Sequence, residues 1–166
     1  MISHLFLITL ISLSFEASIK TYSTFDLLQY TFQVLGNSRN FFVLDPDKYL
    51  MNSFNFLEAQ RLLESLYRIR GMKTFVYICS NINNLSSRFP EQIAFELGKR
   101  LDNTFQPQYY FVLVIAAEQR KYFYYVGEKI RRYLPPNYVD IIVSRQSKLF
   151  NERRFADVIM GILRNL

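Results

Sequence analysis

Four acidic side chains of this chain could together bind a divalent cation: Asp45, Asp47, Asp102 and Glu118. Calcium in proteins is held by about six to eight oxygen atoms, several of them from carboxylates. Asp45 and Asp47 follow one predicted strand and Glu118 follows another, and ligands of α/β sheets gather beyond the carboxyl ends of the strands. We expect Asp45-Pro46-Asp47 to form a turn, in which Asp accepts hydrogen bonds from the local backbone. The alternative is a divalent-cation site built from the four carboxylates, with calcium as the candidate cofactor.

The residues that most hydrolases need are scarce. The chain has a single histidine, His4, and a single cysteine, Cys79. His4 lies in the N-terminal leader, so no Ser-His-Asp or Cys-His pair can be assembled in the domain. One cysteine excludes an intramolecular disulfide and a four-cysteine zinc site. Cys79 ends an apolar segment, and we expect it to be a buried small hydrophobe. The sequence therefore shows no complete catalytic site.

The N-terminal segment is predicted to target the chain to a membrane. An apolar run extends from Leu5 to Phe15, and the small residues Ala17 and Ser18 follow it. This order is typical of a secretory signal peptide, and the run is short for a transmembrane helix. We predict that residues 1–18 are a signal peptide and that the mature domain is extracellular or lumenal. One alternative is an uncleaved anchor that keeps the domain on a membrane. The other is a mitochondrial leader, although such a leader should be rich in arginine and this segment has none.

A secretory route would also make Asn84 a candidate glycosylation site. Asn84-Leu85-Ser86 is a sequon. It lies in the polar segment from Ser80 to Ser87, where a glycan would be accessible.

The charge of the chain indicates a basic surface. The formal net charge is +6 and the pI is about 9.5. The basic residues are spread along the sequence, which is typical of a solvated surface and would suit contact with an anionic membrane. The run Tyr122-Phe123-Tyr124-Tyr125 could stack on bases. Because it alternates within a predicted strand, we expect most of its rings in the core and predict no nucleic-acid partner.

The elements that would position these residues form one small domain. With 166 residues the chain has room for a single core. After a lead-in at 19–40 with a short helix near 25–35, the domain spans 41–166. Strands are predicted at 41–44, 73–79, 109–117 and 122–126, and helices at 54–70, 90–102, 127–133, 137–146 and 151–166. This order predicts an α/β fold, with a small mixed sheet of about four strands covered by helices.

Two of these segments have clear signals. The helix 54–70 carries an apolar face, and Gly71 is placed to end it in a left-handed conformation. We assign to that face Leu57, Leu62, Leu63, Leu66 and Ile69. The near-continuous apolar run 109–117 predicts a central strand that is buried on both faces.

Several of these segments, in this order, resemble the TPM domain family. The resemblance covers residues 42–165 approximately. It rests on Val43-Leu44-Asp45-Pro46-Asp47 with Leu50, Phe75-Val76-Tyr77-Ile78, Glu96-Leu97, Phe111-Val112-Leu113-Val114, Glu118-Gln119-Arg120, Tyr125-Val126-Gly127 and Phe155-Ala156-Asp157-Val158-Ile159. The chain departs from the family pattern at two positions. No glycine follows Asp102-Asn103, and Glu118 stands where the family often has aspartate.

The resemblance implies an extracytoplasmic domain. Members of the family are linked to weak acid phosphatase activity, to binding of calcium, and to tuning of a ligand-gated channel by an auxiliary subunit. We predict a non-enzymatic interaction or auxiliary module whose partner is a membrane protein or protein assembly. One alternative is a divalent-metal-dependent acid phosphatase in which Arg120 steadies the phosphate. The other is a structural subunit of a membrane complex.

Overall fold

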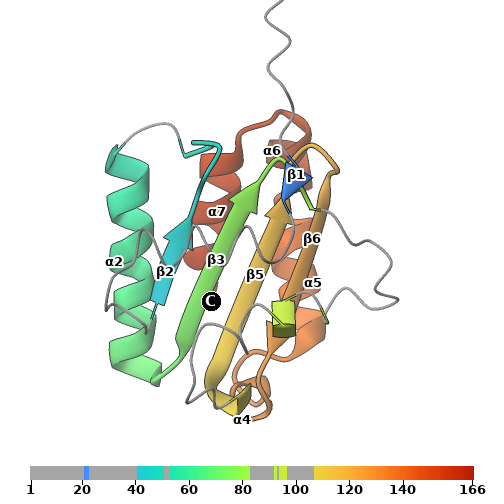
Figure 1. Ribbon diagram of the computed structural model, residues 1–166. Coiled ribbons are helices and arrows are strands. Elements are labelled where there is room, and N and C mark those ends of the chain that lie inside the picture. The colour runs from blue at the N-terminus through green and yellow to red at the C-terminus, as the bar shows by residue number, and fades with distance from the viewer. Residues whose placement is uncertain (1–20, 23–40, 51–52, 83–91, 93, 97–106) are drawn as a thin grey trace, which may run out of the picture.

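The computed structural model describes residues 21–22, 41–50, 53–82, 92, 94–96 and 107–166 (Figure 1). The strands are β1 (Thr21–Tyr22), β2 (Phe41–Leu44), β3 (Lys73–Cys79), β4 (Asn81–Ile82), β5 (Tyr110–Ala116) and β6 (Lys121–Val126). The helices are α2 (Ser53–Arg70), the 3-10 turn η1 (Pro107–Tyr109), α4 (Glu128–Arg131), α5 (Pro136–Ser144), α6 (Ser147–Asn151) and α7 (Phe155–Leu163).

The main sheet has four strands in the order β2-β3-β5-β6. The pairs β2–β3 and β3–β5 are parallel, and β6 turns back antiparallel to β5. Helix α2 connects the first two strands and packs against both of them and against α7 (Figure 1). The structure thus confirms the predicted α/β fold with a mixed sheet covered by helices.

Strand β5 is buried along its whole length, as its apolar run predicts. It lies between β3 and β6 in the sheet. Its side chains point alternately to the two faces, and each face meets a separate cluster of core side chains. Phe111, Leu113 and Ile115 point to the cluster that α2, α5 and α7 complete. The alternate side chains, such as Val112 and Val114, join the cluster on the opposite face. The sheet therefore divides the core into two layers.

Helix α2 confirms the predicted helix and its end. Gly71 adopts φ 62°, and its N–H donates to the Tyr67 carbonyl at 2.8 Å, which closes the last turn. The predicted apolar face was partly wrong, because the side chains of Leu57 and Ile69 are exposed. Each lies six positions from the fully buried Leu63, and six residues rotate a helix by about 120° away from the buried side.

The C-terminal part contains one more helix than predicted. The chain forms α5, α6 and α7 where two helices were expected, and the last begins at Phe155 instead of residue 151. Arg153 has φ 59°, a left-handed conformation that a helix cannot include. It therefore separates α6 from α7.

A second, two-stranded sheet was also not predicted. Strand β4 lies in the segment that was expected to be a polar loop, and it pairs in parallel with β1. The side-chain amide of Gln119 holds this strand, since it accepts from the Ile82 N–H at 3.1 Å and donates to the Ile82 carbonyl at 3.2 Å. An amide side chain here replaces a backbone partner, which local sequence patterns do not reveal.

Some predicted elements fall outside the described residues. These are the leader at 1–18, the short helix near 25–35 and most of the helix at 90–102, of which residues 92 and 94–96 are helical. Among the helices that the structure describes, none combines the length and apolar character needed to cross a bilayer.

Candidate functional site

The turns that follow β2, β3 and β5 meet at the carboxyl edge of the parallel strands, at the top of Figure 1. Asp45 and Asp47 lie in the turn after β2, Ser80 directly follows β3, and Glu118 lies in the turn after β5. The backbone N–H of Glu118 donates to the Ser80 carbonyl at 3.0 Å, so these two turns are joined directly. The sheet topology thus brings three of the four predicted acidic residues to one edge.

Asp47 ties the turn after β2 to the end of β3. One carboxylate oxygen, Oδ2, accepts from the Ser80 backbone N–H at 2.7 Å and from the Ser80 hydroxyl at 2.8 Å. Ser80 is only 8% exposed, so both of its donors depend on a protein acceptor. Asp47 therefore acts as the acceptor that satisfies a buried strand end.

Tyr49 links this pair to Glu118. Its hydroxyl oxygen lies 3.0 Å from the Ser80 hydroxyl and 3.1 Å from Glu118 Oε1. Because a tyrosine has one hydroxyl proton, it can donate to only one of the two at a time. Burial raises the pKa of Tyr49 to about 12, and Glu118 adds to this rise. The phenol is therefore a proton donor, and not a base, at neutral pH.

Glu118 also pairs with a cation that sequence reasoning did not identify. Its carboxylate accepts a hydrogen bond from the Arg153 guanidinium in an ion pair. The Tyr49 ring meets the Phe155 ring edge-on at 4.9 Å, which fixes the start of α7 against the same turn. The edge is thus a continuous network from Arg153 through Glu118, Tyr49 and Ser80 to Asp47.

Asp45 has a different, local role. Its two oxygens accept from the backbone N–H groups of Tyr49 and Leu50, both at 2.8 Å. This geometry is the turn chemistry typical of aspartate. Burial raises the pKa of the Asp45 carboxyl above 3.8, although the backbone bonds from Leu50 and Tyr49 oppose that rise. Asp45 therefore stabilises the turn that carries Asp47.

The described residues do not by themselves provide a calcium cage. Within this part of the chain, no group of three or more His, Cys, Asp or Glu side chains is arranged to hold a metal ion. The oxygens of Asp45 and Asp47 accept protein N–H and O–H groups, and Glu118 already faces a cation. Asp102 lies outside the described residues. Calcium binding by these residues remains a prediction.

Of the two other predicted site residues, the structure describes Arg120. Arg120 lies in the turn between β5 and β6 with φ 52°, and its N–H donates to the Ala117 carbonyl at 3.2 Å. Its side chain is exposed, and no hydrogen bond or ion pair joins it to the acidic residues that the structure describes. Asn84, the candidate glycosylation site, lies outside the described residues.

The sequence analysis missed three members of the network: Tyr49, Ser80 and Arg153. A signal existed for Ser80, since it follows a predicted parallel strand and must reach the same edge as Asp47 and Glu118. Arg153 carried no such signal, because it lies 35 positions from Glu118 and in a predicted helix. Arg153 lies in the break between α6 and α7, which the sequence pattern did not predict.

Comparisons with known proteins identify the fold. No protein-family model matches the chain, and no match was found among curated proteins. The N-terminal domain of a protein from P. gingivalis, solved by solution NMR, has a TM-score of 0.68 and 15% identity, and the match covers 89% of this chain and 92% of that one.

A second solution NMR structure, the N-terminal domain of a Corynebacterium glutamicum protein, has a TM-score of 0.54 and 10% identity. That match covers 78% of each chain. At these identities the likeness shows a shared fold alone.

Proposed function

We propose that this chain is a TPM-like domain that acts as a non-enzymatic interaction module for a membrane protein or protein assembly on the extracellular or lumenal side of a membrane. The observation that carries the proposal is an exposed apolar surface on α2. Phe54 is 68% exposed and Leu57 is 54% exposed. Such large apolar side chains at a surface are typical of protein-binding sites when they lie together.

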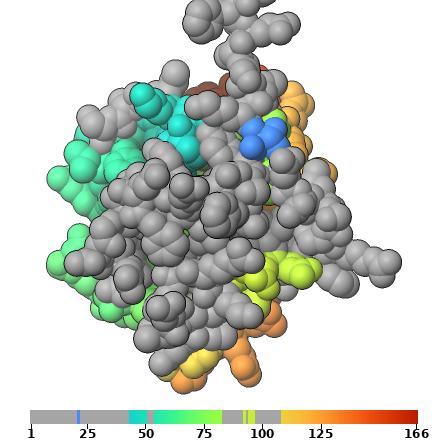
Figure 2. Space-filling view, in the orientation of Figure 1, coloured from blue at the N-terminus to red at the C-terminus, as the bar shows by residue number. Residues whose placement is uncertain are grey.

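Helical spacing places these two side chains together. Phe54, Leu57 and the exposed Arg61 are three and four residues apart, so they form one stripe along the outer face of α2. Figure 2 shows α2, in teal to green, at the left margin of the molecule in the orientation of Figure 1. Aromatic side chains and arginine are enriched in protein interfaces. We name these three residues the outer α2 stripe.

The inner side of the same helix already has a structural role. Ala59 and Leu63 are fully buried, and Phe56, Leu62 and Leu66 pack on the core. The side chains of the outer α2 stripe are therefore not part of the domain's core. The network at the carboxyl edge also supports a non-enzymatic role, because its described carboxylates serve as acceptors for protein donors.

The proposal is tested by crosslinking the tagged full chain in membranes of the source cells and quantifying each crosslinked protein. The variant Phe54→Ser with Leu57→Ser should lower the yield of a specific partner by about tenfold or more, since central apolar anchors often contribute 2 kcal/mol or more. Ile69→Ser with Ile141→Ser is the matched control, because both isoleucines are exposed outside the stripe. Equal yields from wild type and the stripe variant would refute the role of the stripe.

A divalent-metal-dependent acid phosphatase is the alternative function, favoured by the meeting of Asp47 and Glu118 at one edge. Such an enzyme would need the metal to polarise the phosphoryl oxygen and Arg120 to steady the phosphate. Purified full chain should then hydrolyse an aryl phosphate with calcium or magnesium and lose that activity in Asp45→Asn with Asp47→Asn. No hydrolysis under either metal would dismiss this alternative.

A structural subunit anchored by residues 1–18 is the third proposal. Mass spectrometry of the N-terminal peptide separates it from the secreted module. A mature chain that begins near Ile19 would indicate a cleaved signal peptide, and one that retains the leader would indicate an anchor.

A further inference from the structure

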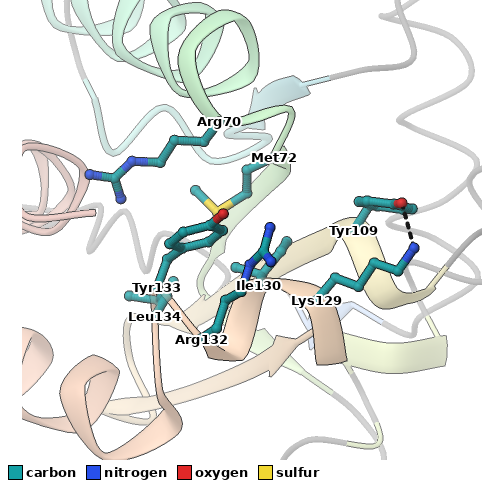
Figure 3. A pocket seen from close by; sticks show the side chains of 8 residues that line it. All are labelled: Arg70, Met72, Tyr109, Lys129, Ile130, Arg132, Tyr133 and Leu134. Atoms are coloured by element: carbon teal, nitrogen blue, oxygen red, sulfur yellow. Dashed lines mark hydrogen bonds between the residues drawn. The ribbon is translucent and has the colours of Figure 1, made fainter.

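A second charged site lies at the opposite edge of the sheet (Figure 3). It is a shallow pocket lined by Arg70, Met72, Tyr109, Lys129, Ile130, Arg132, Tyr133 and Leu134. Arg70 and Met72 precede β3, and Tyr109 precedes β5, so the pocket is at the amino edge of the parallel strands. It is therefore separate from the acidic network at the carboxyl edge and from the outer α2 stripe.

Two cations of this pocket are held in place by aromatic rings. The Lys129 ammonium donates to the Tyr109 hydroxyl at 2.6 Å and lies 4.5 Å from the centre of that ring. The Arg132 guanidinium lies 4.4 Å from the centre of the Tyr133 ring. These contacts favour the observed positions of the two exposed side chains and leave their charges unneutralised.

Neither cation has an acidic partner among the residues that the structure describes. The ion pairs of that part of the chain involve other arginines, at positions 68, 153, 154 and 164. Arg70 contributes less, since its guanidinium donates to the Leu166 carbonyl and points away from the other two cations in Figure 3. Lys129 and Arg132 are thus two positive charges that line one pocket, with the Lys129 ammonium beside Tyr109 and the Arg132 guanidinium over Tyr133.

The base of the pocket is apolar. Met72, Ile130 and Leu134 are each 5% exposed or less. An apolar base lowers the dielectric constant on one side of the two exposed cations, which strengthens their attraction to a bound anion. The cavity itself is small, about 40 Å³, and it opens to solvent, so only a small anionic group suits it.

We propose that Lys129 and Arg132 bind a phosphomonoester group in this pocket. Such a group carries about −1.5 to −2 charges at neutral pH, which two cations would balance. The planar guanidinium fits two phosphate oxygens at once, and the ammonium supplies a point charge beside them. The Tyr109 hydroxyl, whose oxygen accepts from Lys129, keeps its own proton to donate to a third oxygen.

A phosphomonoester could come from a soluble metabolite or from a lipid headgroup. The same two cations would recognise both, and the proposal does not depend on the outer α2 stripe. Titration with inorganic phosphate probes the soluble source. Vesicles of phosphatidylcholine with and without phosphatidic acid probe the lipid source.

The experiment uses the full chain in about 0.15 M salt, which screens unspecific attraction between surface charges. Calorimetry measures the phosphate affinity, and flotation measures vesicle binding. The test variant is Lys129→Gln with Arg132→Gln. The control is Arg131→Gln with Lys148→Gln, which removes the same charge. Arg131 lies in the same helix, but its Nε donates to the Val126 carbonyl and it does not line the pocket.

We expect saturable binding of phosphate, of phosphatidic acid vesicles, or of both, that is about tenfold weaker in the test variant and unchanged in the control. Acetate should bind the wild type more weakly than phosphate, because it carries one charge and two oxygens. The proposal is overturned if neither probe binds. It is also overturned if the test variant and the control lose the same affinity, since only net charge would then matter.

Discussion

The bond between Asp47 and Ser80 gives the sharpest test of the acidic edge. Replacing Asp47 by alanine removes the acceptor of two hydrogen bonds, at 2.7 and 2.8 Å, that come from one residue of 8% exposure. The Ser80 hydroxyl can rotate toward another oxygen. Its backbone N–H cannot, because strand β3 fixes its direction.

The magnitude follows from these two bonds. A buried donor that loses its acceptor costs about 1–3 kcal/mol, and a hydrogen bond to a charged group contributes about 1.5–3 kcal/mol. Since these contributions overlap, and the hydroxyl recovers part of its loss, we expect Asp47→Ala to lower the free energy of unfolding by about 2–4 kcal/mol.

Urea unfolding of the full chain, followed by circular dichroism, measures this loss. The matched control is Asp140→Ala, because that carboxylate also accepts two hydrogen bonds, from Tyr122 and Tyr124, but lies exposed. We expect the control to lose less than about 1 kcal/mol, as water can replace the carboxylate there. If Asp47→Ala loses no more than Asp140→Ala, water must already reach the Ser80 N–H, and the reasoning fails.

Three further predictions concern the core and its turns. Burial raises the pKa of Cys79 to about 12, so the only thiol of the chain should resist iodoacetamide in native protein and react readily in urea. Rapid labelling of the native state would contradict its burial. Gly71→Ala should lower stability by about 1 kcal/mol, because the φ of Gly71 is left-handed. Gly161→Ala in α7 should be neutral or stabilising by up to about 1 kcal/mol, once the flexible Gln146 side chain moves aside. Thermal unfolding compares the two variants, and an equal loss of stability in both would refute the distinction. Because the folded state raises the pKa of Asp45, its carboxyl binds a proton more tightly folded than unfolded, so its contribution to stability is full below about pH 3.8 and is lost as the pH rises through the folded pKa. The stability of wild type relative to Asp45→Asn should therefore fall as the pH rises above about 3.8, and an increase in relative stability with pH would refute the prediction.

Periodicity and turn residues were enough to predict most of the fold. Residues 73–79 form a strand, as the sequence pattern predicts. Gly71 ends α2 because that position requires a positive φ, which glycine adopts without strain. The apolar run of β5 indicated a central strand for a physical reason: helices and loops must cover both of its faces. Each of these signals is local.

The features that escaped prediction are long-range. Strand β4 depends on Gln119, which lies 37 positions away, and the ion pair of Glu118 depends on Arg153. The exposure of Leu57 was missed because a helix of leucines indicates an apolar face but not how wide that face is. Its width is set by the sheet and by α7, which bury Leu63 and leave Leu57 outside.

The sheet topology also has a consequence for the order of folding. The hairpin β5–β6 is the one pairing in the main sheet that a short turn can close, since four residues, 117–120, separate its strands. The parallel pairs must first close much longer loops, of which the β2–β3 connection contains all of α2. Closing longer loops costs more entropy, so we expect the hairpin to form early in folding. During synthesis, however, β2 and α2 leave the ribosome first and have to wait for the strands that will bury them.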